Sequence, residues 1–132
     1  MHRWLKAHLK TTFPALFIDD ALEISIGNGW VPLLHRLCFA LTRLDCPVAF
    51  GQIKEKFGGL RAYLVGEQAA AYELEGHAEL ESDLVCEQCG EDGRAALDGP
   101  GGLWLLTLCV DCLDAGSTDG RQRVWDVGED SA

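Results

Sequence analysis

The spacing of apolar and polar residues changes along the chain, and each change predicts a new element. Residues 3–13 carry apolar residues at helical spacing up to Pro14, which predicts a short amphipathic helix. Residues 22–26 alternate apolar and polar side chains, as a half-buried strand does. The Gly-Asn-Gly run at 27–29 is expected to end that strand, because these residue types tolerate positive φ.

Residues 30–44 give the clearest helical pattern. Their apolar residues recur at steps of three and four, and Pro32 falls in the first turn, where its missing N–H costs nothing. The stripe consists of Leu34, Leu37, Cys38, Leu41 and Leu44. Cys38 is therefore expected to be buried as a small apolar residue, whereas Cys46 is interpreted as a free thiol.

A β-hairpin is predicted over residues 48–65, with its turn at Phe57-Gly58-Gly59-Leu60. The expected register pairs Phe57 with Leu60, Glu55 with Ala62, and Ile53 with Leu64, all on the core face. Glu55 would then need a partner such as Arg36 or His35. The opposite face would carry Lys54, Lys56, Arg61 and Tyr63. That face is either a contact surface for an anion or a partner, or a solvated face paired with acids of the next helix.

The remaining chain divides into a helix and a cysteine-bearing segment. A helix is expected over residues 67–84, a Gly-rich loop over 93–102, and an apolar strand over 103–108. The predicted fold class is α+β, with N-terminal helices packed on a small antiparallel sheet or hairpin, followed by a C-terminal zinc ribbon. The expected units are a body (1–83), a zinc-ribbon subdomain (84–115) and a loosely ordered acidic tail (116–132).

Two Cys-x-x-Cys pairs carry the most specific chemistry in the sequence. Cys86 and Cys89 are separated by 19 residues from Cys109 and Cys112, a spacing typical of structural zinc sites. Four thiolates complete the tetrahedral coordination of one Zn²⁺ and leave no open position, so the ion would be structural. Six cysteines also permit disulfides, but the pair spacing favours zinc, and no export signal is visible.

Charge is distributed unevenly over the 132 residues, whose formal net charge is −10. Residues 1–61 carry eight basic and five acidic residues, whereas residues 62–132 carry three and sixteen. The acidic half should repel nucleic acid and attract basic surfaces, although the same excess would suit a merely soluble acidic protein. No apolar run approaches the ~20 residues that span a bilayer, so a cytoplasmic location is expected.

Several segments together resemble a family of small bacterial and phage proteins of uncharacterised function. The resemblance rests on Gly29-Trp30, on the run Gln52-Ile53-Lys54-Glu55-Lys56-Phe57-Gly58-Gly59-Leu60-Arg61, and on the two Cys-x-x-Cys pairs. It covers roughly residues 27–112, with Ala62 where that family more often has an aromatic residue. It implies a "QVKEKFGGLRFY"-like hairpin joined to a zinc ribbon. By gene neighbourhood, it also implies an inhibitor or immunity role against toxins.

No nucleophile–base pair, phosphate-binding loop or zinc-deaminase motif is present, so no enzymatic activity is expected. The first hypothesis is an acidic zinc-ribbon inhibitor or immunity-type protein that blocks the basic cleft of a toxin or enzyme. Its aromatic anchors would be Trp104 or Trp125. The alternative is a nucleic-acid-binding or transcription accessory protein that uses the Lys54, Lys56 and Arg61 face with Tyr63. A purely structural phage or bacterial component remains a third hypothesis.

Overall fold

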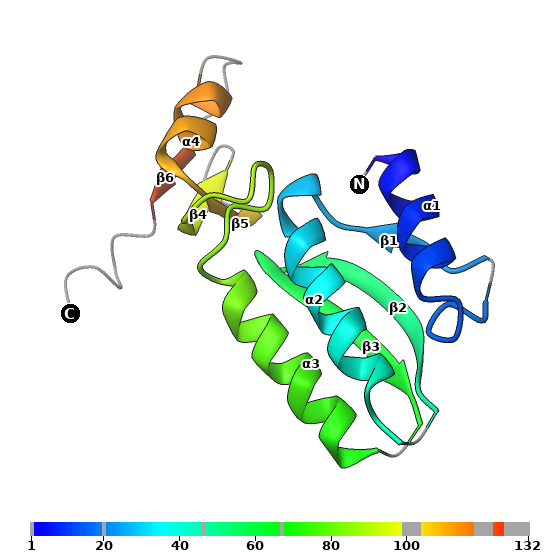
Figure 1. The fold of residues 1–132 in the computed structure, drawn as a ribbon. Coiled ribbons are helices and arrows are strands. Elements are labelled where there is room, and N and C mark those ends of the chain that lie inside the picture. Colours follow the sequence, from blue (N-terminus) through cyan, green and yellow to red (C-terminus); the bar gives the residue numbers. More distant parts are fainter. Residues whose placement is uncertain are drawn as a thin grey trace.

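The computed structural model describes residues 2–19, 21–45, 47–66, 68–98, 104–117 and 123–125, with the backbone alone at 98, 104, 116, 117 and 123–125. Two sheets organise the chain, one in a body that runs from α1 to α3 and one in a ribbon that follows it (Figure 1). The elements of the body are α1 (Arg3–Thr12), β1 (Ile24–Ser25), α2 (Val31–Thr42), β2 (Ala49–Lys56), β3 (Gly59–Val65) and α3 (Ala69–Ser82). Those of the ribbon are β4 (Arg94–Asp98), β5 (Trp104–Leu108), α4 (Val110–Ser117) and β6 (Arg123–Trp125).

The predicted α+β class with a C-terminal zinc ribbon is confirmed. The helices predicted over 3–13, 30–44 and 67–84 correspond to α1, α2 and α3, each ending within a few residues of the expected position. Pro32 lies in the first turn of α2, as predicted. No helix in the described part of the chain is both long and apolar enough to cross a bilayer.

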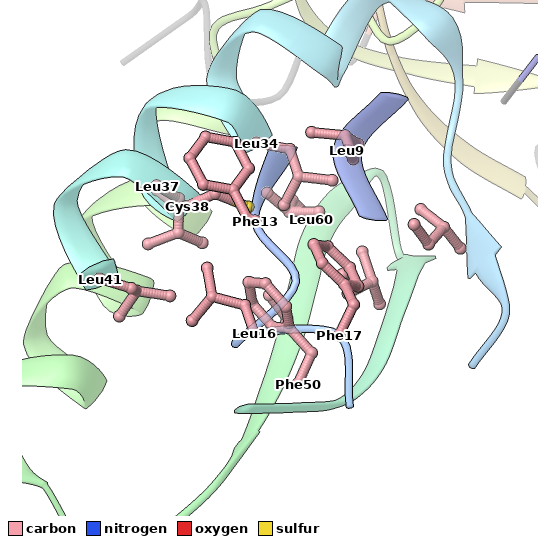
Figure 2. Packing of buried hydrophobic residues seen from close by; sticks show 14 of the residues in the cluster. Leu9, Phe13, Leu16, Phe17, Leu34, Leu37, Cys38, Leu41, Phe50 and Leu60 are labelled. Atoms are coloured by element: carbon pink, nitrogen blue, oxygen red, sulfur yellow. The ribbon is translucent and has the colours of Figure 1, made fainter. Parts of the chain in front are cut away.

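The body is a three-stranded sheet in the order β1-β2-β3, covered on one face by helices (Figure 1). β2 and β3 form the predicted antiparallel hairpin, whereas β1 is parallel to β2 and pairs Ile24 with Ile53. α3 packs against both α2 and β3. Figure 2 shows side chains of α2 and of the segment after α1 packed together with Phe50 and Leu60 of the hairpin. Cys38 lies within this core and is fully buried, as predicted.

The predicted hairpin register is wrong by two residues. The structure pairs Lys56 with Gly59, Glu55 with Leu60, and Ile53 with Ala62. The central turn residues are therefore Phe57 and Gly58, with φ of 54° and 77°, as a type I′ turn requires. Two hydrogen bonds hold this turn. One is local, from the Gly58 N–H to Glu55 Oε1 at 2.8 Å, and one is tertiary, from Thr107 Oγ1 to the Gly58 carbonyl at 2.6 Å.

A shift of two residues keeps each side chain on its predicted face, because strand side chains alternate with a period of two. Ile53, Leu60 and Ala62 are buried as expected. Phe57, however, was expected on the core face and is 72% exposed at the turn. A register irregularity between Phe50 and Gln52 adds one residue to β2 at Gly51 and turns Phe50 into the core.

The ribbon holds more structure than its sequence pattern indicates. β4 was predicted as part of a loop, but it is the central strand of the second sheet, in the order β5-β4-β6. The helix α4 begins directly after Cys109 and was not predicted. β6 lies inside the segment predicted as a tail and pairs with β4. The rest of that segment from residue 118 onward lies outside the described residues.

Candidate metal centre

The four predicted ligand sulfurs converge on one point. The sulfurs of Cys86, Cys89, Cys109 and Cys112 all lie within 4.8 Å of one another, and the Cys89 and Cys109 sulfurs are 3.4 Å apart. Tetrahedral Zn²⁺ with bonds of about 2.3 Å requires sulfurs about 3.8 Å apart, so the donor set and its spacing fit this ion. These cysteines form a single structural zinc site and are not joined by disulfides. Cys46 lies outside the described residues.

Local backbone geometry shapes each ligand pair. In the first turn, Gly90 adopts φ of 86° and its N–H donates to the Cys86 carbonyl at 2.9 Å. In the second, the Cys112 N–H points at the Cys109 sulfur at 3.4 Å. Cys109 precedes α4 and Cys112 lies in its first turn, where free N–H groups favour thiolates. The glycine after Cys89 is therefore required by the positive φ of this turn.

The ionisation of the ligand thiols favours a bound cation at this site. Burial disfavours ionisation of Cys86, but the N–H groups of Cys109, Cys89 and Gln88 directed at its sulfur lower its pKa to about 7. Burial, together with the surrounding sulfurs, raises the pKa of Cys112 above its usual range. Thiols this close cannot all ionise without a compensating charge, and bound Zn²⁺ supplies it.

The first cysteine turn rests directly on residues 27–29 of the body. The Gly29 N–H donates to the Glu87 carbonyl at 2.9 Å. A Cβ at Gly27 would lie 2.0 Å from the Glu87 oxygen, and one at Gly29 would lie 2.1 Å from the Cys86 oxygen. The strand ends before residues 27–29, as predicted, but neither glycine has positive φ, so positive φ is not the reason. Glycine is needed here because two backbones approach closely.

Two further contacts join the zinc centre to the body. Trp30, fully buried in the body core, donates its Nε1–H to the Val85 carbonyl at 2.8 Å, one residue before the first ligand. Thr107 contacts both halves: its N–H donates to the Glu87 carboxylate at 3.1 Å, and its hydroxyl donates to Gly58 of the hairpin turn. Sequence reasoning missed Thr107, since a threonine within a strand gives no signal of its tertiary contacts.

The predicted cationic face forms only in part. Lys54 lies opposite Arg61 on the outer face of the hairpin, and the Lys54 Nζ is 6.0 Å from the Tyr63 ring centroid. Lys56 makes a similar contact, with its Nζ 5.6 Å from the centroid of Phe57. Arg61 instead turns toward α3, where its guanidinium is 2.9 Å from the Glu79 carboxylate. Arg61 therefore follows the interpretation of a face paired with acids of the next helix.

The other predicted contacts have different outcomes. Glu55 accepts from the backbone of Gly58, so the expected pairing with Arg36 or His35 is wrong. Arg36 is 2.9 Å from Glu81 of α3 instead. Trp104 and Trp125 lie in β5 and β6, and their side chains are outside the described part of the structure. Among the described residues, the four cysteines are the group of metal-binding side chains that the fold brings together.

Comparison with known proteins returned no match to any family model, curated protein or solved structure. The spacing of the four cysteine sulfurs identifies a zinc-binding protein.

Proposed function

We propose that this zinc-binding protein is a non-enzymatic interaction protein that covers a basic cleft of a protein partner, as an inhibitor or immunity protein does. The observation that supports it is the set of exposed acids on α3, in the turn that closes it and on the ribbon. They are Glu73, Glu81, Asp83, Glu91, Asp92, Asp111 and Asp114. Over the described residues from 68 to 117, Arg94 is the one exposed arginine or lysine.

The zinc site contributes rigidity to this surface. Four protein ligands leave zinc no position for a substrate, so the ion fastens the fold and does not take part in a reaction. The hydrogen bonds from Gly29 to Glu87 and from Trp30 to Val85 hold the ribbon on the body. Acids on both parts are thereby presented in a fixed arrangement, which lowers the entropy lost on binding.

The expected mechanism is electrostatic steering followed by occlusion. A field of one sign raises the rate of encounter with an oppositely charged cleft and is screened by salt. A cleft that normally holds nucleic acid or nucleotide phosphates has the required positive charge. The partner class is therefore a toxin or enzyme that acts on such substrates.

The test is capture of the partner from nuclease-treated lysate of the source organism by immobilised zinc-loaded protein. The expected result is an enzyme with a basic cleft that elutes as salt is raised and that the protein inhibits. A double variant with Glu73→Gln and Asp92→Asn should lose most of the captured enzyme. The matched control, Glu23→Gln with Asp45→Asn, changes the charge equally at exposed positions of the body and should retain it. Equal capture by both variants would contradict the proposal.

A second candidate function has one observation in its favour. Lys54 with Tyr63 and Lys56 with Phe57 form two cation–aromatic pairs on one end of the hairpin. Such pairs can bind single-stranded nucleic acid by base stacking and phosphate contact. Salt-dependent retention on a nucleic-acid column that is lost in Lys54→Gln with Lys56→Gln would favour this function over the first.

A further inference from the structure

The solvent face of α3 carries a line of apolar and small residues. Leu80 is 67% exposed and Leu84 is 66% exposed, while the opposite face of the helix buries Ala71, Ala78 and Ser82. Gly76 lies one turn before Leu80, at a spacing that places both on the same side of a helix. Leu84 continues the line in the closing turn, where its N–H donates to the Glu81 carbonyl at 3.0 Å.

None of the residues that the structure describes requires glycine at position 76. A Cβ added there would have no heavy atom within 4 Å, and the residue does not adopt positive φ. Glycine in the middle of a helix is less favourable than alanine because it loses more conformational freedom on folding. The free protein therefore gains no packing from Gly76 and no burial from Leu80. Both features suit close approach of another molecule to α3.

The charges around this line indicate what that molecule is. Glu73 is exposed on the same helix and Asp83 directly after it, and Glu81, whose side chain is 56% exposed, is paired with Arg36. A second copy of the chain would bring a matching set of acids against these and be repelled. A partner with basic residues around an apolar stripe would complement both the charges and the leucines.

We propose that the line Gly76–Leu80–Leu84 is a docking site for a basic amphipathic helix of the partner protein. An apolar side chain of that helix would lie over Gly76, between the flanking acids, with Leu80 and Leu84 as anchors. This inference rests on the proposed function and names the surface and the partner element through which it acts.

The test uses a synthetic helical peptide with leucines at steps of three and four and lysines elsewhere, compared with a scrambled peptide of the same composition. The intact zinc-loaded protein should bind the amphipathic peptide at least about tenfold more tightly than the scrambled one. Leu80→Gln should remove that preference. The control Ile18→Gln alters a side chain that is 72% exposed in the body, and it should leave the preference unchanged.

The variant Gly76→Ala distinguishes an effect on peptide docking from an effect on folding stability. The substitution should raise the melting temperature by about 2–5 °C, because alanine favours the helix, yet weaken peptide binding about tenfold. Unchanged peptide binding in Gly76→Ala, or equal binding of both peptides, would overturn the inference. Self-association in analytical ultracentrifugation that Leu80→Gln abolishes would overturn it in favour of a second copy. If Leu80→Gln still captures the partner and the acid-neutralised variant does not, this inference fails while the proposed function stands.

Discussion

Phe57 combines two features that are unfavourable in the free protein. It is a bulky residue at φ of 54°, and its ring is 72% exposed. Left-handed backbone costs most residues about 1–2 kcal/mol, and asparagine is among the few that adopt it readily. Since Asn-Gly is the preferred centre of a type I′ turn, the fold alone does not explain phenylalanine here.

We expect Phe57→Asn to stabilise the protein by about 0.5–1 kcal/mol, because asparagine relieves the strain at this turn. Urea unfolding followed by far-UV circular dichroism measures the change. Phe57→Val is the control and should destabilise the protein, since a β-branched residue tolerates positive φ poorly. A loss of stability in the asparagine variant would show that the exposed ring supports the fold.

Cys89 is the exposed member of the zinc site, so its substitution tests metal binding with little direct effect on the core. Cys89→Ser should release zinc and unfold at least residues 84–114, because metal binding at such sites supplies folding free energy. Metal analysis should fall from one zinc per chain toward none. Cys38→Ala, which removes a thiol from the body core, should retain its zinc. Full zinc content in Cys89→Ser would contradict the four-ligand site.

At the scale of elements, α3 seals the free edge of β3. The N–H of Leu60 donates to the buried Ser82 hydroxyl at 2.9 Å, and that of Ala62 donates to the Glu75 carboxylate at 3.3 Å. Farther along, the Tyr72 hydroxyl donates to the Gly66 carbonyl at 2.6 Å. An unpaired strand edge invites pairing with another chain, so these side chains protect the sheet while fixing the helix against it.

Because of Glu75, the stability of the contact between α3 and the edge of β3 depends on pH. Burial raises the pKa of Glu75 and outweighs the opposing hydrogen bond from Ala62, and the neighbouring Glu79 adds to the rise. The charged form is thus less favourable in the folded than in the unfolded chain. The contribution of the Glu75 side chain to stability is greatest below the ordinary glutamate pKa. That contribution is lost as pH rises through the elevated pKa of the folded state.

Glu75→Gln should therefore increase stability at pH 7, by under about 1 kcal/mol given the partial exposure of the site, and should flatten the change between pH 4 and 7. Glutamine can still accept from the Ala62 N–H. Denaturant unfolding across this pH range provides the measurement, with Glu73→Gln on the exposed face of the same helix as control. A larger destabilisation at pH 7 than at pH 4 would contradict the direction given for Glu75.

At the scale of the molecule, the first cysteine turn is the joint between body and ribbon. Gly29→Ala would place a Cβ against the Cys86 oxygen and the Gly90 nitrogen, both backbone atoms that cannot move aside cheaply. We expect a loss of about 3 kcal/mol in the free energy of unfolding. Gly76→Ala, the same substitution at an open helical site, should have the opposite sign. Thermal unfolding of the two variants makes the comparison, and equal effects would contradict the close approach at Gly29.

Chelation tests whether the two halves depend equally on zinc. The body has its own core of buried residues, whereas the buried cluster of the ribbon is small and includes two of the ligands, Cys86 and Cys109. Removing zinc should abolish amide protection in the ribbon and at Gly29, while β2 and β3 remain protected. Hydrogen exchange with and without a strong chelator measures this, and re-addition of zinc is the control. Loss of protection throughout the body would show that the halves fold as one unit.

The sequence by itself determined the three helices of the body and the zinc ligands. The leucine stripe of α2 and the Cys-x-x-Cys pairs are local patterns, because helix spacing and ligand spacing are both written within a few residues. The faces of the hairpin were also predictable, since strand alternation survives a shift of two residues.

Only the tertiary structure decided the features that depend on contacts between distant residues. Thr107 donates to the Gly58 carbonyl from 49 residues away, and this contact helps to hold the turn at Phe57-Gly58 and not at the glycine pair that local preference would choose. Arg61 pairs with Glu79 of α3, a helix that follows it in the chain. β4 forms a strand because β5 and β6 pair with it on its two sides. Gly27 and Gly29 are the clearest case of a feature that local sequence does not reveal. Glycine is required at these positions because the carbonyl oxygens of Glu87 and Cys86, nearly sixty residues away in the chain, approach them closely.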